Sequence, residues 1–209
     1  MQVMAPIPPF SSRRARAVAF TLIEVIVSLA VLLILAAVAL PSLNGYLDQK
    51  SVETTATQLT TVADALNGPT NSFYKAMTRN ASRLSFLSTV IVQSNAGYLD
   101  SCGAQFTKAG DITNWTGSGP FVNFNIDRTT GLVTLIGVAR DTITRIPFSA
   151  TTGNLRINFI DGVDLKYATL LDQFVDAGNG FNTGTVQWNL PAVNGQVVMF
   201  YFIPVNNKC

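Results

Sequence analysis

The chain of 209 residues contains no histidine and only two cysteines. Without histidine it can form neither a Ser-His-Asp nor a Cys-His nucleophile pair, nor any histidine-ligated metal site. Two cysteines on their own are too few for a structural zinc site. Carboxylate-based chemistry and a calcium site built from oxygen ligands remain possible.

Charged residues are also scarce, at 12% of the chain against roughly 25% in an average soluble domain. Hydrophobic residues make up 48%. This balance excludes a disordered chain and a nucleic-acid binder that uses a broad basic face. The net charge of +2 is also local, because Arg13, Arg14 and Arg16 lie in the first nineteen residues, which hold no acid. We therefore predict no nucleic-acid partner.

One long hydrophobic run dominates the N-terminal part. Residues 25–40 are sixteen residues without a charge, and an extension back to Phe20 makes 21. As a helix this segment would be roughly 31 Å long, which is enough to cross a hydrocarbon core of about 30 Å. The basic stretch before it predicts that the leader stays cytoplasmic and that the residues after Pro41 lie outside.

Glu24 is the only charge in this segment. A carboxylate at the centre of a membrane helix costs about 2.5–3.5 kcal/mol on insertion scales, and less near an interface. One interpretation is that Glu24 sits at the headgroup level and needs no partner. The sharper one is that it pairs with a cation, which a cut after Ala19 would supply as a new α-amino group at Phe20.

The run AFTLIEVIVSLAVLLILAAVALPSL resembles the processing signal and first helix of type IV pilins and of the pseudopilins of type II secretion. A basic leader and a small residue precede Phe20, and TLIEV places Glu24 four positions later. Pro41 stands where pilins carry a helix-kinking proline, and Tyr46 follows it. The resemblance covers about residues 11–50. It departs from the family at Ala19, where glycine is preferred.

The resemblance implies that a membrane peptidase removes the leader, residues 1–19, and methylates the new N-terminus at Phe20. Glu24 would then neutralise the amino group of Phe20 in a neighbouring subunit. The protein would be a structural subunit of a pilus or pseudopilus, and neither an enzyme nor a cofactor binder. Its expected partners are other pilin or pseudopilin subunits, the prepilin peptidase, an inner-membrane assembly platform and the lipid bilayer. It would span the bacterial inner membrane once, with the head outside, before entering a filament.

A competing interpretation uses the same residues as an export signal. The stretch SRRARAV is weakly like a twin-arginine signal, and AVA at 37–39 is like a signal-peptidase site. Cleavage after Ala39 would release an exported soluble enzyme or binding domain. This interpretation is disfavoured because the uncharged run exceeds the usual 7–15 residues of such signals, and because it leaves Glu24 unexplained.

For the rest of the chain we predict an α+β fold in which the long helix packs on a mostly antiparallel sheet, as in pilins. Residues 20–40 form the membrane part, and 41–68 form an amphipathic continuation with Leu59, Val62, Ala63 and Leu66 on one face. Gly68-Pro69 ends this helix, and 69–209 form the head.

Within the head, we predict a helix over 71–92 capped by Asn71, a loop over 108–120 and a short helix over 164–175. Alternating apolar residues predict three hairpins. Their strands are 121–126 with 132–139, 143–148 with 154–160, and 185–190 with 196–204.

Two further groups of residues are candidates for covalent or ligand chemistry. Outside the cytoplasm Cys102 and Cys209 would pair, similar to the C-terminal disulfide of many pilins, although theirs usually encloses a shorter region; two unrelated thiols are the alternative. Four acids lie close in sequence near a faintly calcium-loop-like DAGNG, and we interpret them as solvated acids, so that no metal is predicted: Asp161, Asp164, Asp172 and Asp176. The aromatics Trp115, Trp188 and Tyr201 suit a carbohydrate face, but core positions are more usual for them.

Overall fold

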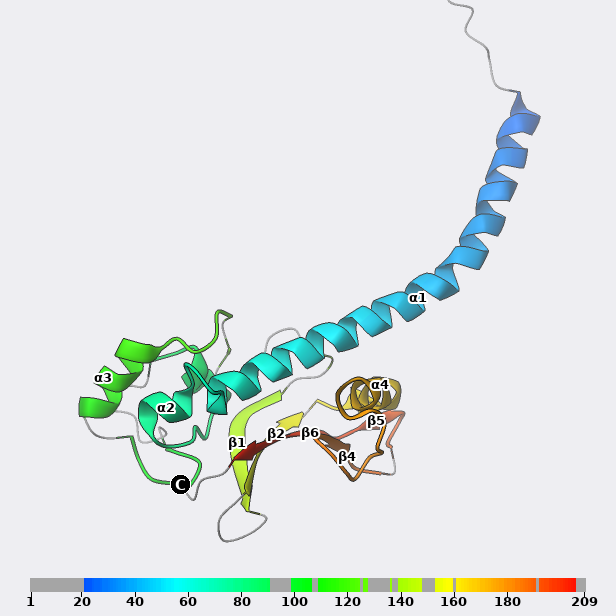
Figure 1. Cartoon of the computed structure of the whole chain (residues 1–209). Helices are drawn as coiled ribbons and strands as arrows, with labels where there is room; N and C mark the ends of the chain where they lie inside the picture. Colours follow the sequence, from blue (N-terminus) through cyan, green and yellow to red (C-terminus); the bar gives the residue numbers. More distant parts are fainter. Residues whose placement is uncertain are drawn as a thin grey trace, which may run out of the picture. The chain divides into compact units, whose positions relative to one another are not determined.

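The computed structural model describes residues 21–90, 99–106, 109–124, 126–127, 136, 139–147, 153–159, 161–190 and 192–205. The chain divides into two compact units, Met1–Asn44 and Gly45–Cys209. The first contains the beginning of helix α1 (Leu22–Asn67), and the second contains its remainder and the whole head. The result is an α+β layout with one long N-terminal helix and a small antiparallel sheet (Figure 1).

Helix α1 is continuous over 46 residues. Its polar part is rich in threonine, and the hydroxyls of Thr54, Thr57 and Thr61 each donate to the carbonyl four residues earlier. The helix ends at Asn67, as Gly68-Pro69 predicted, and the N–H of Gly68 makes a last helical bond to Asp64 O at 2.7 Å. A Cβ at position 68 would collide with that same carbonyl oxygen, so only glycine fits this close approach.

The sheet consists of four strands in the order β1-β2-β6-β4, and every pairing between them is antiparallel. The strands are β1 (Ala139–Pro147), β2 (Gly153–Phe159), β4 (Val186–Trp188) and β6 (Met199–Val205). The β1–β2 and β4–β6 pairs confirm the second and third predicted hairpins. A second, two-stranded sheet pairs β3 (Val163–Asp164) with β5 (Gln196–Val197), and the sequence did not predict it.

The turn before β5 explains why the third hairpin could be predicted from the sequence. Asn194 and Gly195 have φ angles of 52° and 78°. Val193 and Gln196 exchange two backbone hydrogen bonds of 2.9 Å across them. Positive φ at both central residues is the geometry that Asn-Gly favours in tight hairpins.

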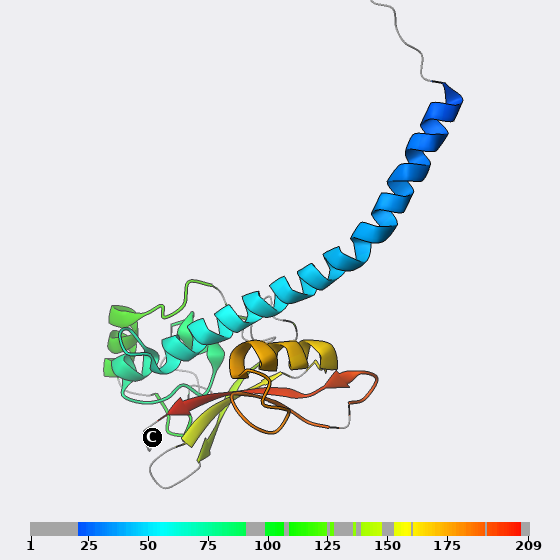
Figure 2. The same cartoon turned by 45° about the vertical axis from the view of Figure 1, so that its right-hand side comes forward.

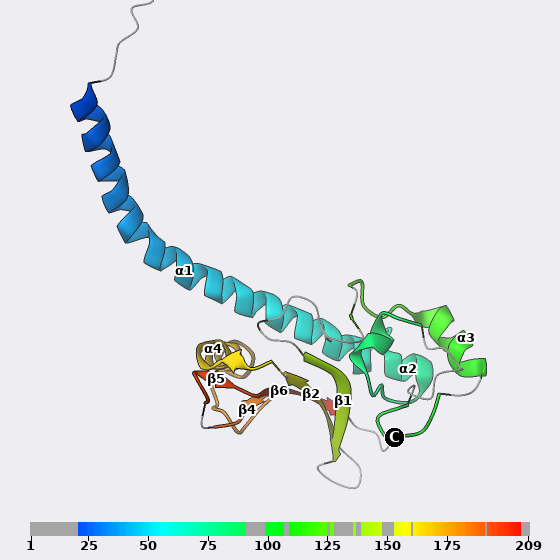
Figure 3. The same ribbon diagram turned by 180° about the vertical axis from the view of Figure 1, so that it is seen from behind.

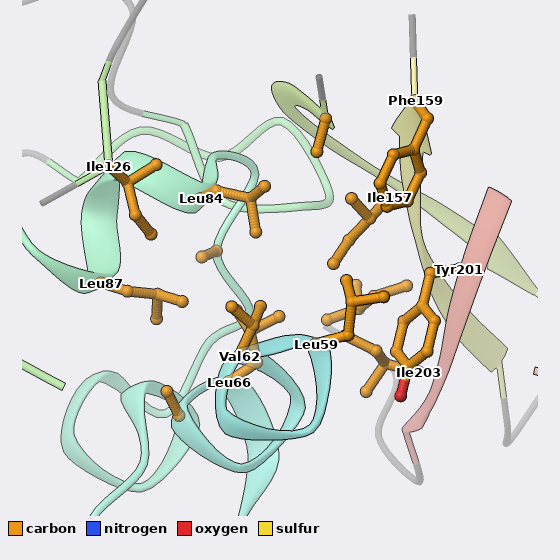
Figure 4. Close-up of a cluster of buried hydrophobic side chains, with 14 of the residues drawn as sticks. Leu59, Val62, Leu66, Leu84, Leu87, Ile126, Ile157, Phe159, Tyr201 and Ile203 are labelled. Carbon is orange, nitrogen blue, oxygen red and sulfur yellow. The ribbon is translucent and has the colours of Figure 1, made fainter. Parts of the chain in front are cut away.

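The core lies between the second half of α1 and the sheet (Figure 4). Leu59, Val62 and Leu66 are fully buried, as the predicted stripe requires. They pack between Leu84, Leu87 and Ile126 on one side and the strand residues on the other: Ile157, Phe159, Tyr201 and Ile203. Burial of one such aliphatic side chain stabilises the fold by about 1.5–3 kcal/mol, so this stripe fixes α1 to the head.

Helix α4 (Leu165–Asp176) lies on the same face of the sheet as α1 (Figure 2). It confirms the helix predicted over 164–175, with Ala168 and Leu171 fully buried and Leu165 and Val175 packed against the core. In the part of the chain that the structure describes, no helix covers the opposite face of the sheet (Figure 3).

The predicted helix over 71–92 is wrong as a single element. The structure has a short helix α2 (Phe73–Met77) and a 3-10 turn η1 (Leu84–Leu87) instead. The cap of α2 is Ser72, whose hydroxyl accepts the N–H of Lys75, while Asn71 donates to Ser118 O at 3.0 Å. The helix stops because Thr78 turns left-handed, with φ 56°.

The predicted loop over 108–120 is also wrong, because α3 (Ala109–Ser118) is a helix. Tertiary contacts decide this. Trp115 is buried and its indole N–H donates to Phe86 O at 2.7 Å. Asp111 forms an ion pair with Arg79 at 2.9 Å. These contacts outweigh the weak helix propensity of a glycine-rich segment.

The first predicted hairpin is not formed in the residues that the structure describes. The segment 121–124 consists of bends, and the N–H groups of Phe121 and Val122 both bond to Leu87 O instead of a partner strand. Most of the predicted partner, 132–139, lies outside the described residues, and Ala139 itself begins β1.

Candidate functional site

Glu24 lies in the first turn of α1 and bonds to Thr21, the residue before the helix. Its Oε2 accepts the backbone N–H and the hydroxyl of Thr21, both at 3.2 Å. In return, Thr21 Oγ1 accepts the backbone N–H of Glu24 at 3.3 Å. This reciprocal pattern is a capping box, which satisfies two of the free N–H groups at a helix start.

The capping box is a role of Glu24 that we did not predict, although its signal was present. Thr-x-x-Glu before an apolar run is the sequence signature of this cap, and TLIE carries it. The cap supplies hydrogen bonds but no positive charge. Among the described residues, no basic side chain forms an ion pair with Glu24. A carboxylate that entered an apolar environment with this cap alone would carry an uncompensated charge, which is costly.

The first half of α1 exposes almost only apolar side chains. Leu22 and Val38 are about as exposed as surface residues can be, at 79% and 74%. In the described chain, α1 is the one helix long and apolar enough to cross a membrane, and its most apolar window has no buried residue. Exposed apolar surface of this extent is a site for lipid or protein contact.

The structure describes some of the predicted site residues but not all of them. Ala19 and Phe20 lie outside the described residues, directly before Thr21. Pro41 lies within α1, which runs through it without ending. The predicted assembly residues Glu24 and Pro41 are therefore parts of one continuous helix.

A polar junction ties α1 to α4 at the start of the head. Asp48 on α1 accepts the Lys166 ammonium at 2.9 Å and the Tyr167 hydroxyl at 2.6 Å. The hydrogen bond to Asp48 raises the pKa of Lys166 and also that of Tyr167, since the carboxylate stabilises both protonated groups. This junction fixes α4 beside the helix segment that follows the apolar surface.

Cys102 lies in a turn that Asp100 organises. The Oδ1 of Asp100 accepts the N–H groups of Cys102 and Ala104, at 2.9 and 2.8 Å. Its Oδ2 lies 3.5 Å from the guanidinium of Arg79, which also pairs with Asp111. Cys209 lies outside the described residues, so the Cys102–Cys209 disulfide stays a prediction.

The four acids near the C-terminal third are not all solvated, which corrects our interpretation. Asp161 and Asp164 are exposed, but Asp172 is 2% exposed, and its Oδ2 accepts the N–H of Gly180. Asp176 accepts the N–H groups of Thr185 and Val186 at 2.7 and 2.6 Å. Asp172 and Asp176 thus hold the 177–186 segment. The described residues contain no cluster of three or more metal-ligating side chains.

The three aromatic residues that were considered for a carbohydrate face lie in the core instead. Trp115, Trp188 and Tyr201 are all less than a tenth exposed, and burial raises the pKa of Tyr201. None of the three presents an open ring face on which a sugar could stack.

No protein-family model, no curated protein and no solved structure matches this chain.

Proposed function

We propose that the chain is a structural subunit of a type IV pilus or of a type II secretion-like pseudopilus, assembled through α1. One observation carries this proposal. A single helix begins with a capped but charge-uncompensated carboxylate, exposes an apolar surface over its first half and enters the core of a folded head with its second half. Such a helix suits a membrane-anchored subunit that later packs against copies of itself.

Under this proposal Glu24 has two functions. Its Oε2 caps its own helix through Thr21, while the negative charge attracts the methylated amino group of Phe20 from a neighbouring subunit. An unpaired charge in lipid is costly, so a pair that forms only between subunits favours assembly and sets the axial register. The capping box supports the second function, because it holds the carboxylate at the end of the helix, close to where that amino group would lie.

The proposal places the leader, residues 1–19, in the cytoplasm and the head outside the inner membrane. Prepilin peptidase would cut between Ala19 and Phe20. The alternative cut after Ala39 finds less support, because Ala39 lies inside α1, which continues unbroken from Leu22 to Asn67. A cut there would remove the apolar half of a helix whose other half belongs to the core.

Variants at the residue before the cut test the proposal. Ala19→Leu should keep its leader, because a peptidase that accepts only a small side chain there would exclude leucine. We expect maturation to slow by at least about tenfold, the factor equivalent to 1.4 kcal/mol. The measurement is the intact mass of the membrane-bound protein after a pulse of synthesis.

Ala19→Gly is the matched control and should mature at least as fast as the parent. If the leucine variant loses the same nineteen residues at the parental rate, processing does not depend on this position and the proposed cut is wrong.

A further inference from the structure

A hollow of about 470 Å³ lies on the face of the sheet opposite to α1 and α4, at the edge formed by β4. Its walls combine aromatic rings, among them Phe181, Phe200 and Phe202, with the polar side chains of Arg156, Asn182, Gln187 and Asn189. A pocket of this size that combines aromatic rings with convergent polar groups can hold a small ligand. The filament function proposed above does not require this hollow.

The register of the strands explains why these side chains meet. Arg156 on β2 pairs with Phe202 on β6, and Gln187 on β4 pairs with Phe200. Paired residues of an antiparallel sheet project to the same face. Their neighbours along each strand, such as Ile157 and Tyr201, point into the core instead. The outer face therefore carries a mixed aromatic and polar row where a soluble domain usually carries charges.

One donor beside the hollow lacks an acceptor. The Nε of Arg156 is buried without a hydrogen-bond partner in the described chain. The guanidinium of Arg156 lies 4.9 Å from the centre of the Phe200 ring. Among the described residues that line the hollow, none is acidic. A buried donor without an acceptor is costly, so acceptor oxygens from a ligand would be favourable here.

We propose that this hollow binds an acidic saccharide. The sugar carboxylate would accept charge-assisted hydrogen bonds from Arg156. The ring hydroxyls suit the carboxamides of Asn182 and Asn189, which both donate and accept. The apolar face of the sugar would lie against Phe200 and Phe202, whose rings are only half-buried. The described lining holds no carboxylate that would repel the ligand.

The test uses the full chain in zwitterionic detergent micelles without sugar headgroups, titrated calorimetrically with digalacturonic acid. The neutral comparison is galabiose, which differs only at C6. We expect saturable binding of the acid that is at least about tenfold tighter than that of galabiose, as one charge-assisted contact would give.

Variants separate the charge from the fold. Arg156→Gln should lower the affinity for the acid to the level of galabiose, while Arg156→Lys should retain part of the preference. Phe202→Ala should weaken both ligands, and Arg83→Gln, a matched loss of charge outside the hollow, should change neither. Absence of saturable binding, equal affinity for galabiose, or an unchanged affinity in a folded Arg156→Gln variant would each overturn the proposal.

Discussion

Glu24→Val is expected to insert into the membrane as well as the parent or better, and to lose most of its incorporation into filaments. Insertion benefits because the substitution removes the cost of a carboxylate in the apolar segment. Assembly suffers because the Phe20 ammonium of a neighbouring subunit is left unpaired. Removal of one partner from a buried ion pair costs about 3–5 kcal/mol, so the loss of incorporation should exceed tenfold, equivalent to about 1.4 kcal/mol. The measurement is the fraction of subunits in sheared filaments relative to the membrane pool.

The capping box makes a sharper control possible, because Glu24 has two separable roles. Glu24→Gln keeps the cap, since glutamine serves equally at this position, but loses the charge. Thr21→Ala keeps the charge but loses the hydroxyl of the cap, which typically costs about 0.5–2 kcal/mol of local helix stability. We expect Glu24→Gln to fail like Glu24→Val and Thr21→Ala to assemble nearly normally.

The opposite ranking would contradict the pairing between subunits. If Glu24→Gln assembles normally while Thr21→Ala and Glu24→Val both fail, then the cap, and not the charge, is what assembly requires. Normal yield from all three variants would remove any role of Glu24 in assembly.

Leu59→Ala should destabilise the head by about 2–5 kcal/mol, the range for a fully buried leucine whose removal leaves a cavity. Leu59 has no exposed surface and packs between η1 and the sheet. The matched control is Leu47→Ala on the same helix. Leu47 is 55% exposed, so its truncation should stay within about 0.5 kcal/mol of the parent.

Both variants can be measured by denaturant unfolding of a chain that begins at Gly45, where the second compact unit starts. We expect this chain to be soluble, because the truncation removes most of the exposed apolar side chains of α1. The difference should also appear as a loss of several degrees in Tm, at roughly 2–4 °C per kcal/mol. Equal stability of the two variants would show that α1 does not pack on the sheet.

Elements whose local sequence pattern agrees with their packing were predictable from the sequence. The apolar spacing of Leu59, Val62 and Leu66 located the buried face of α1, and alternation located β2 and β6. The Asn194-Gly195 pair marked the turn of the last hairpin. In each case the local pattern and the tertiary packing favour the same structure.

Elements that depend on partners far along the chain were not predictable. Nothing within 71–92 shows that Arg79 will leave the helix to pair with Asp111 and Asp100 and to lie 4.3 Å from the Phe106 ring. The ion pair between Arg79 and Asp111 also helps to hold the glycine-rich segment 109–118 as helix α3. At the candidate site, the pairing of Glu24 with a neighbouring subunit remains a proposal. Its capping box with Thr21 could have been predicted from the Thr-x-x-Glu pattern.

The N-terminal sequence of the mature protein, purified from bacterial membranes, tests the central claim most directly. Because processing after Ala19 exposes Phe20, the account predicts a single mature species that begins with N-methylated phenylalanine followed by Thr-Leu-Ile-Glu. A mature species that begins at Leu40 would instead identify an exported soluble domain, and would contradict assembly through α1.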